Sequence, residues 1–78
     1  MLNEKQKMIV ELLRTSGCAT AKDISNLLIL RKGVKVSPQS VAGTIRPWIE
    51  RGWAANSPNG NGGKVYWLTE YGKTQLKE

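Results

Sequence analysis

The sequence predicts an α+β fold that is mainly helical, with a three-helix core, a C-terminal β-hairpin and a short last helix. Three helical patterns, each opened by a capping residue, fill residues 3–52. The pattern then changes to short strand-like segments on either side of a run rich in Asn, Gly and Pro at 56–63. A chain of 78 residues has room for one domain with a small core, so we expect residues 1–78 to form a single domain.

The first helix is expected to begin after Asn3, which can cap it, while Gln6 completes a capping box. Gly17 is expected to end it. Apolar residues at helical spacing mark the inner face: Met8, Ile9, Leu12 and Leu13.

The second helix is expected to open at Thr20, with Asp23 at the capping-box position. Its predicted inner face is Ala21, Ile24, Leu27 and Leu28. The run 27–30 is more apolar than a surface helix needs, which predicts packing on two sides. A basic connector follows at 31–36, in which valines alternate around Lys35. That alternation makes a short extended piece plausible, and such a piece could pair with the later hairpin.

The third helix has the strongest local signal. Ser37 can cap it, and Pro38 stands at the first helical position, where its missing N–H costs nothing. Gly52 is placed to end it. Pro47 inside the helix removes the hydrogen bond to the carbonyl of Gly43, which predicts a kink or a loosened turn at 43–47. The predicted inward stripe is Val41, Ile45, Trp48 and Ile49.

Residues 53–55 and 64–68 are expected to form the two strands of the hairpin, with 56–63 as a long tip. Thr69 can cap the short last helix, which carries Tyr71 and Leu76. The expected order of elements is helix, an optional short strand, helix, helix, strand, strand, helix.

The chain carries a net charge of +6, and most of this charge lies on the second half of the predicted core and the hairpin. Residues 31–64 contain six basic residues and a single acid, Glu50, which accounts for five of the six net charges. An anionic partner is therefore expected; nucleic acid is the usual one, and an anionic membrane surface is the alternative. No apolar stretch approaches the length of a membrane span, and the N-terminus does not resemble a secretory signal.

Histidine is absent and Cys18 is the only cysteine, which excludes the common zinc sites, an internal disulfide and the usual nucleophile–histidine pairs. We therefore expect no catalytic residues, no cofactor and no metal. We expect Cys18 to be a buried small thiol, with a redox switch as the alternative.

Three stretches in this order resemble the winged helix-turn-helix family of transcription regulators: TAKDISNLL at 20–28, SPQSVAGTIRPWIERGW at 37–53 and YWLTEYGKTQL at 66–76. The second resembles the recognition helix of that family, and the third resembles the segment that follows its wing. The resemblance implies a non-enzymatic, sequence-dependent reader of duplex DNA. It further implies a small prokaryotic or viral transcription regulator in the cytoplasm, as a possible homodimer or part of a larger transcription complex. The connector and Pro47 depart from the family pattern, and Gly43 stands where many members carry a long polar side chain.

The expected DNA-binding residues lie on the third helix at 37–51, on the connector and on the hairpin. They are Arg31, Lys32, Lys35, Ser37, Gln39, Ser40, Gly43, Thr44, Arg46 and Lys64. On the helix, Gln39 would pair with adenine, and Arg46 with guanine or a phosphate. The connector cations would hold phosphates without reading sequence. A solvated helix face and ordinary solubilising charge are the alternatives.

Other functions leave different signatures in the sequence. Trp53 and Trp67 are expected in the core, although they could instead stack on single-stranded bases. The main rival function is a protein-interaction module, which would show an exposed apolar patch around the third helix. The hairpin tip at 56–64 could contact the minor groove or a phosphate of DNA, and a loop that touches nothing is the alternative.

Overall fold

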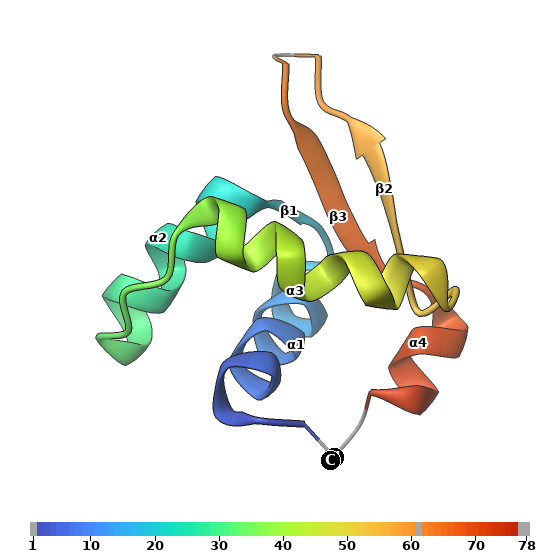
Figure 1. The fold of residues 1–78 in the computed structure, drawn as a ribbon, viewed down its shortest axis with the longest axis horizontal. Helices are drawn as coiled ribbons and strands as arrows, with labels where there is room; N and C mark the ends of the chain where they lie inside the picture. Colours follow the sequence, from blue (N-terminus) through green and yellow to red (C-terminus); the bar gives the residue numbers. More distant parts are fainter. Residues whose placement is uncertain (1, 61, 77–78) are drawn as a thin grey trace.

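The computed structural model describes residues 2–60 and 62–76, and its elements follow the predicted order. The helices are α1 (Glu4–Ser16), α2 (Ala21–Lys32), α3 (Pro38–Glu50) and α4 (Glu70–Gln75). The strands are β1 (Ala19–Thr20), β2 (Ala54–Pro58) and β3 (Lys64–Leu68). The first three helices pack against one another, and the β2–β3 hairpin projects away from them as a wing (Figure 1). The mainly helical α+β fold with a C-terminal hairpin is confirmed.

The predicted helix starts are confirmed by their hydrogen bonds. In α1, the side chain of Asn3 accepts from the backbone N–H of Gln6 at 2.8 Å. The side chain of Gln6 accepts from the backbone N–H of Asn3 at 2.9 Å. Thr20 caps α2 by accepting from the N–H of Asp23 at 3.0 Å. Ser37 caps α3, with Pro38 in the first turn as expected. These side chains satisfy backbone donors that a helix start leaves unpaired.

The core lies where α1, α2 and α3 meet the sheet. It contains most of the predicted inner residues of the three helices, and Val10 of α1 is buried in addition. The predicted inner residues that are only half-buried are Met8, Ala21, Leu27 and Ile49. The side chains that are fully buried are Ile9, Leu12, Leu13, Ile24, Leu28, Val41, Ile45 and Leu76. Deep burial of these apolar side chains is the main stabilising contribution in a domain of this size.

The third strand of the sheet is β1, which lies between α1 and α2. Strand order is β1-β3-β2, and both pairings are antiparallel. Ala19 pairs with Tyr66 and Thr20 with Val65. The suggestion that residues 34–36 pair with the hairpin is wrong, because these residues form no strand and the carbonyl of Val36 instead accepts from the hydroxyl of buried Ser25.

The connector is also shorter than predicted. Helix α2 continues through Lys32 and ends at Gly33, whose left-handed conformation lets its N–H bond the carbonyls of Leu28 and Ile29. Arg31 and Lys32 therefore belong to the last helical turn. On the hairpin, β2 runs on to Pro58, so the tip is shorter than the predicted 56–63.

Two burial predictions are wrong. The run 27–30 does not pack on two sides, because Ile29 is 45% exposed and Leu30 is 79% exposed. Only the α2 face that carries Leu28 meets the core. Cys18 is exposed rather than buried, because Ala19 is the inward residue of β1 and its neighbour points the other way.

Helix α3 runs without a break from Pro38 to Glu50, so Pro47 is accommodated inside it. The carbonyl of Gly43 has no N–H to accept from at Pro47. Gly43 is exposed, and a side-chain carbon added there would meet nothing within 4 Å beyond the helix's own backbone. The end of the helix is closed by Gly52, which has φ of 79° and donates to the carbonyl of Ile49 at 3.0 Å.

Helix α4 is fastened to the root of the wing by Thr69. The backbone N–H of Thr69 donates to the carbonyl of Trp53 at 3.0 Å, and its hydroxyl donates to the carbonyl of Gly52 at 2.7 Å. The same hydroxyl accepts from the N–H of Gly72 at 2.9 Å, which caps α4 as predicted. Buried Gly72 thereby lies directly against the backbone of Trp53.

Candidate nucleic-acid interface

One face of α3 is left uncovered by the rest of the molecule. The burial of Val41, Ile45 and Trp48 fixes the rotation of the helix about its own axis. Gln39, Gly43 and Arg46 consequently lie on the opposite, exposed side. This is the arrangement in which a helix can enter the major groove of duplex DNA.

A hollow of about 170 Å³ lies between this helix and the sheet. Its lining includes Ala42, Arg46 and Glu50 from α3, together with Asn56, Lys64 and Tyr66 from the wing strands. Arg46 and Lys64, which sequence analysis placed on separate elements, thus border one concave surface. Arg46 makes no hydrogen bond or ion pair with any residue in the described part of the chain, so its five donors face solvent.

A second, wider hollow of about 690 Å³ lies on the other side of the wing, against the start of α2. Lys22 and Lys64 both line it. Sequence analysis missed Lys22, because a lysine in the first turn of a helix reads as an ordinary solvated residue. Only the pairing of β1 with β3 brings the start of α2 to the wing.

The predicted hydroxyl contacts of α3 are already used inside the protein. The hydroxyl of Ser37 accepts from the N–H of Ser40 at 3.1 Å, and that of Thr44 donates to the carbonyl of Ser40 at 3.0 Å. The Lys5 ammonium of α1 donates to the hydroxyl of Ser40 at 2.9 Å. Ser40 therefore lies on the side of α3 that faces α1, away from Arg46 and the wing.

The predicted basic cluster of the connector is divided by the structure. Lys32 turns toward α1, where its ammonium lies 3.3 Å from the carboxylate of Glu11. Arg31 and Lys35 are exposed, and neither makes an ion pair with a described residue. Of these three cations, Lys32 alone is held in an ion pair with a described residue.

The two tryptophans outside α3 are half-buried rather than in the core as expected, because Tyr66 and Leu68 are the inward residues of β3 and Trp67 lies between them. Trp53 packs against the core, and the guanidinium of Arg51 lies 5.0 Å from its ring centre. This cation–π contact occupies a ring face that a base would otherwise need for stacking.

Within residues 2–60 and 62–76, no group of His, Cys, Asp and Glu side chains is arranged to hold a metal ion. In the same residues, none of the helices has both the length and the apolar character needed to cross a membrane.

Solved structures show which fold this is. A winged-helix DNA-binding protein from STIV superposes with a TM-score of 0.81 over 97% of this chain and 83% of its own, at 19% identity. RosR from H. salinarum gives a TM-score of 0.79 over 96% of this chain and 67% of its own, at 20% identity. A mutant of MarR from E. coli, complexed with operator DNA, gives 0.74 over 96% of this chain and 51% of its own, at 19% identity.

The chain therefore has a winged helix-turn-helix fold, with α2 and α3 as the helix pair and β2–β3 as the wing. It spans about two thirds of the length of RosR and about half that of MarR. No protein-family model matches the sequence, and no curated protein matches it.

Proposed function

We propose that this protein is a sequence-dependent reader of duplex DNA that regulates transcription in the cytoplasm, by occupying its site and thereby helping or blocking other proteins. The observation that carries the proposal is the solvent-facing Arg46 on the uncovered side of α3, in a hollow shared with Lys64 of the wing. The solved structures with this fold include proteins described as DNA-binding or as complexed with operator DNA, which supports the proposal.

In the proposed complex, α3 lies in the major groove, where Gln39 and Arg46 face base edges and phosphates. Exposed Gly43 lets the backbone of α3 approach the groove without a side chain between them. Lys22 and Lys64 bind phosphates of the DNA backbone beside the wing, and Arg31 and Lys35 bind phosphates near the start of α3. Each phosphate neutralised by a cation releases counterions, which supplies affinity without sequence information.

The rival function, a protein-interaction module, predicts an exposed apolar patch around α3. Among the described residues, the large hydrophobic side chains that are exposed are Ile29, Leu30 and Tyr71, and none of these belongs to α3. The chemistry of the exposed α3 face therefore favours DNA over a protein partner.

Selection of bound sequences from random duplex DNA at near-physiological salt tests the proposal directly. A reader of this kind should enrich a defined motif, and binding to that motif should weaken as salt rises. Recovery of unselected sequences, or binding that does not respond to salt, would contradict it.

The basic residues near the start of α3 give a second expected result. Changing Arg31 and Lys35 together to alanine should weaken binding to every duplex and flatten the slope of log affinity against log salt by up to about 0.9 per lost contact. Lys32→Ala is the matched control, because Lys32 faces Glu11 and its loss should leave the slope close to that of the wild type. Equal slopes for the double variant and the wild type would remove these two residues from the interface.

A further inference from the structure

The last turns of α2 expose two neighbouring aliphatic side chains. Leu30 is 79% exposed and Ile29 is 45% exposed, whereas Leu28 beside them is fully buried. Among the residues that the structure describes, these two are the exposed large aliphatic side chains, and they are adjacent. Contiguous apolar surface on the outside of a protein is typical of a site of interaction.

Hydrogen bonds hold the backbone around this pair in a fixed shape. The helix closes at Gly33, and the N–H of Val34 then donates to the carbonyl of Leu28 at 3.1 Å. The hydroxyl of buried Ser25 donates to the carbonyl of Val36, which holds the far end of the connector. A partner would therefore bind a surface that is already formed, which lowers the entropic cost of binding.

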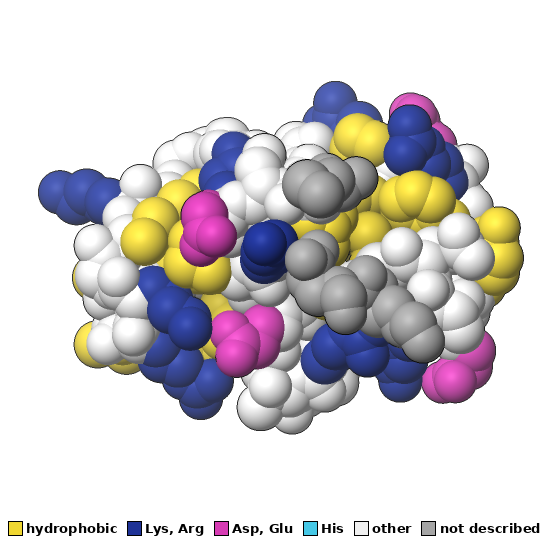
Figure 2. Space-filling view, turned by 90° about the horizontal axis from the view of Figure 1, so that it is seen from below, with side chains coloured by type: hydrophobic (Ala, Val, Ile, Leu, Met, Phe, Trp, Pro, Cys, Tyr) yellow, Lys and Arg dark blue, Asp and Glu magenta, His cyan; other side chains and the backbone are white. Residues whose placement is uncertain are grey.

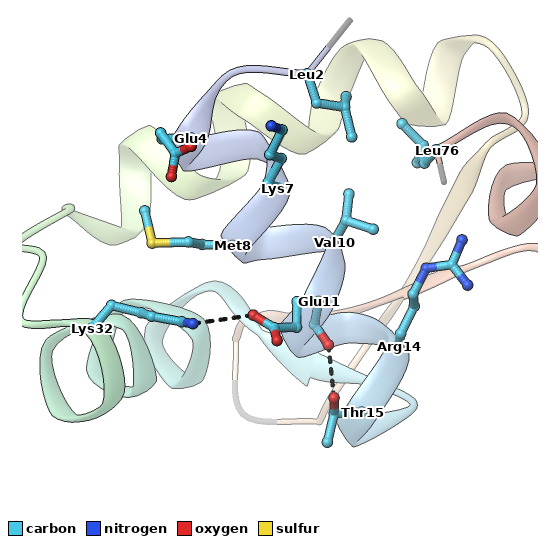
Figure 3. A pocket seen from close by; sticks show the side chains of 10 residues that line it. All are labelled: Leu2, Glu4, Lys7, Met8, Val10, Glu11, Arg14, Thr15, Lys32 and Leu76. Carbon is cyan, nitrogen blue, oxygen red and sulfur yellow. Dashed lines mark hydrogen bonds and ion pairs between the residues drawn. The ribbon is translucent and has the colours of Figure 1, made fainter. Parts of the chain in front are cut away.

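Positive charges border the exposed pair. Arg31 follows Leu30 directly and Lys35 lies on the connector; both are exposed, and neither makes an ion pair with a described residue. At this end of the molecule, on the left in Figures 1 and 2, Figure 2 shows Lys and Arg side chains beside hydrophobic ones. Lys32 differs from the other two, because it points toward Glu11 of α1 (Figure 3).

The chemistry around the pair limits what can bind it. The sequence has no Asp or Glu from residue 24 to residue 49, so this end of the molecule contributes positive charge alone. A second copy of the chain is a poor match, because a two-fold contact would bring Arg31 and Lys35 of both copies together. DNA phosphates match the cations but bury no aliphatic side chain. A protein segment that carries both carboxylates and apolar side chains satisfies both requirements.

We infer that Ile29, Leu30, Arg31 and Lys35 form a docking surface for an acidic amphipathic helix of another protein. Leu30 packs between apolar side chains that are one turn apart on the partner helix. Carboxylates beside those side chains bind the guanidinium of Arg31, which can donate two parallel hydrogen bonds, and the ammonium of Lys35. The surface lies on α2 and the connector, so it is distinct from the exposed side of α3.

This inference goes beyond the proposed DNA binding and does not require it. Arg31 and Lys35 are also the cations proposed to bind phosphates, so the partner helix and the DNA backbone would use them in turn. Leu30 and Ile29 have no part in the proposed DNA complex. Substitutions of the aliphatic pair therefore test the docking surface without removing a charge from the DNA interface.

A synthetic peptide is the probe, and fluorescence anisotropy with the full chain is the measurement. The labelled peptide carries leucines at helical spacing and glutamates and alanines elsewhere; a scrambled peptide of the same composition spreads the leucines around the helix. The wild type should bind the first peptide more tightly than the second. Leu30→Ser should raise the dissociation constant for the first peptide about tenfold or more, because the burial of a leucine side chain is lost.

Two matched variants control for general effects. Tyr71→Ser removes another exposed hydrophobic side chain, from α4, and Arg46→Ala removes a positive charge from α3. Both should leave the dissociation constant for the peptide unchanged. Because Leu30 lies on the surface, Leu30→Ser should also keep the melting temperature of the wild type, and circular dichroism checks this for every variant.

Several results would overturn the inference. They are no binding at about 1 mM peptide, equal binding of the scrambled peptide, and binding that Leu30→Ser leaves unchanged. Vesicles of phosphatidylglycerol and phosphatidylcholine form a separate arm of the experiment. Binding to these vesicles that depends on Leu30, without binding of the peptide, would assign the surface to an anionic membrane instead. None of these measurements involves DNA, so failure here is distinguishable from failure of the proposed function.

Discussion

Replacing Gly72 by alanine is expected to destabilise the fold strongly. A side-chain carbon at residue 72 would stand 1.7 Å from the carbonyl oxygen of Trp53, well inside any allowed contact. The obstructing atom is backbone, and the adjoining backbone is tied by the two hydrogen bonds from Thr69, so it cannot swing aside as a side chain would. We expect a loss of about 3 kcal/mol or more in the free energy of unfolding, at the upper end of overpacking effects.

For a domain of this size, such a loss lowers the melting temperature by about 12–24 °C. Thermal denaturation followed by circular dichroism measures it. Gly43→Ala is the matched control, because residue 43 is helical and exposed and an added carbon there meets nothing. This control should gain about 0.5–1 kcal/mol from the better helix propensity of alanine. Similar melting temperatures for Gly72→Ala and the wild type would refute the close packing of α4 on the wing root.

Replacing Arg46 by alanine is expected to have the largest effect of any single residue on DNA binding. If its guanidinium reads a guanine with two hydrogen bonds, affinity for the preferred site should fall by about 1–3 kcal/mol and preference should relax at one base pair. If it holds a phosphate, affinity should fall similarly for all sequences. Arg46 lies in the hollow beside the wing, toward Lys64, and this position favours the phosphate role.

Binding of preferred and random duplexes, measured side by side for wild type and Arg46→Ala, separates the two roles. Arg51→Ala is the control: it removes the same charge from the end of the same helix, but Arg51 is engaged over the ring of Trp53. Its loss should weaken binding less. Unchanged affinity of Arg46→Ala for both duplexes would exclude α3 as the DNA-facing element, and the protein-interaction function would then replace the one proposed.

Local chemistry made the helices predictable. Capping residues such as Asn3, Thr20 and Ser37 bond backbone N–H groups three residues further along the chain. The glycines that end helices likewise bond carbonyls a few residues before them. The buried stripe of α3 also fixed which of its residues are exposed, so the position of Arg46 on the open face followed from periodicity alone.

The remaining features depend on contacts between distant segments. Strand β1 has two residues, too few to show any alternation, and it is defined only by its pairing with β3. The approach of Lys22 to the wing follows from that pairing and was missed for the same reason. Leu30 was expected to be buried because it is apolar, but burial requires a covering element and none of the described ones reaches it. Likewise, the orientation of Lys32 depends on Glu11, which is far away in sequence.

The sheet order bears on the solubility of the protein. Strand β3 is central, so the free edges of the sheet belong to β1 and β2. An exposed strand edge is a template for pairing with another chain, and it can seed aggregation. Here β1 offers a template of only two residues, and β2 ends in Pro58, which has no N–H to donate to an added strand. Growth of a fibril by strand addition is thereby disfavoured at both edges.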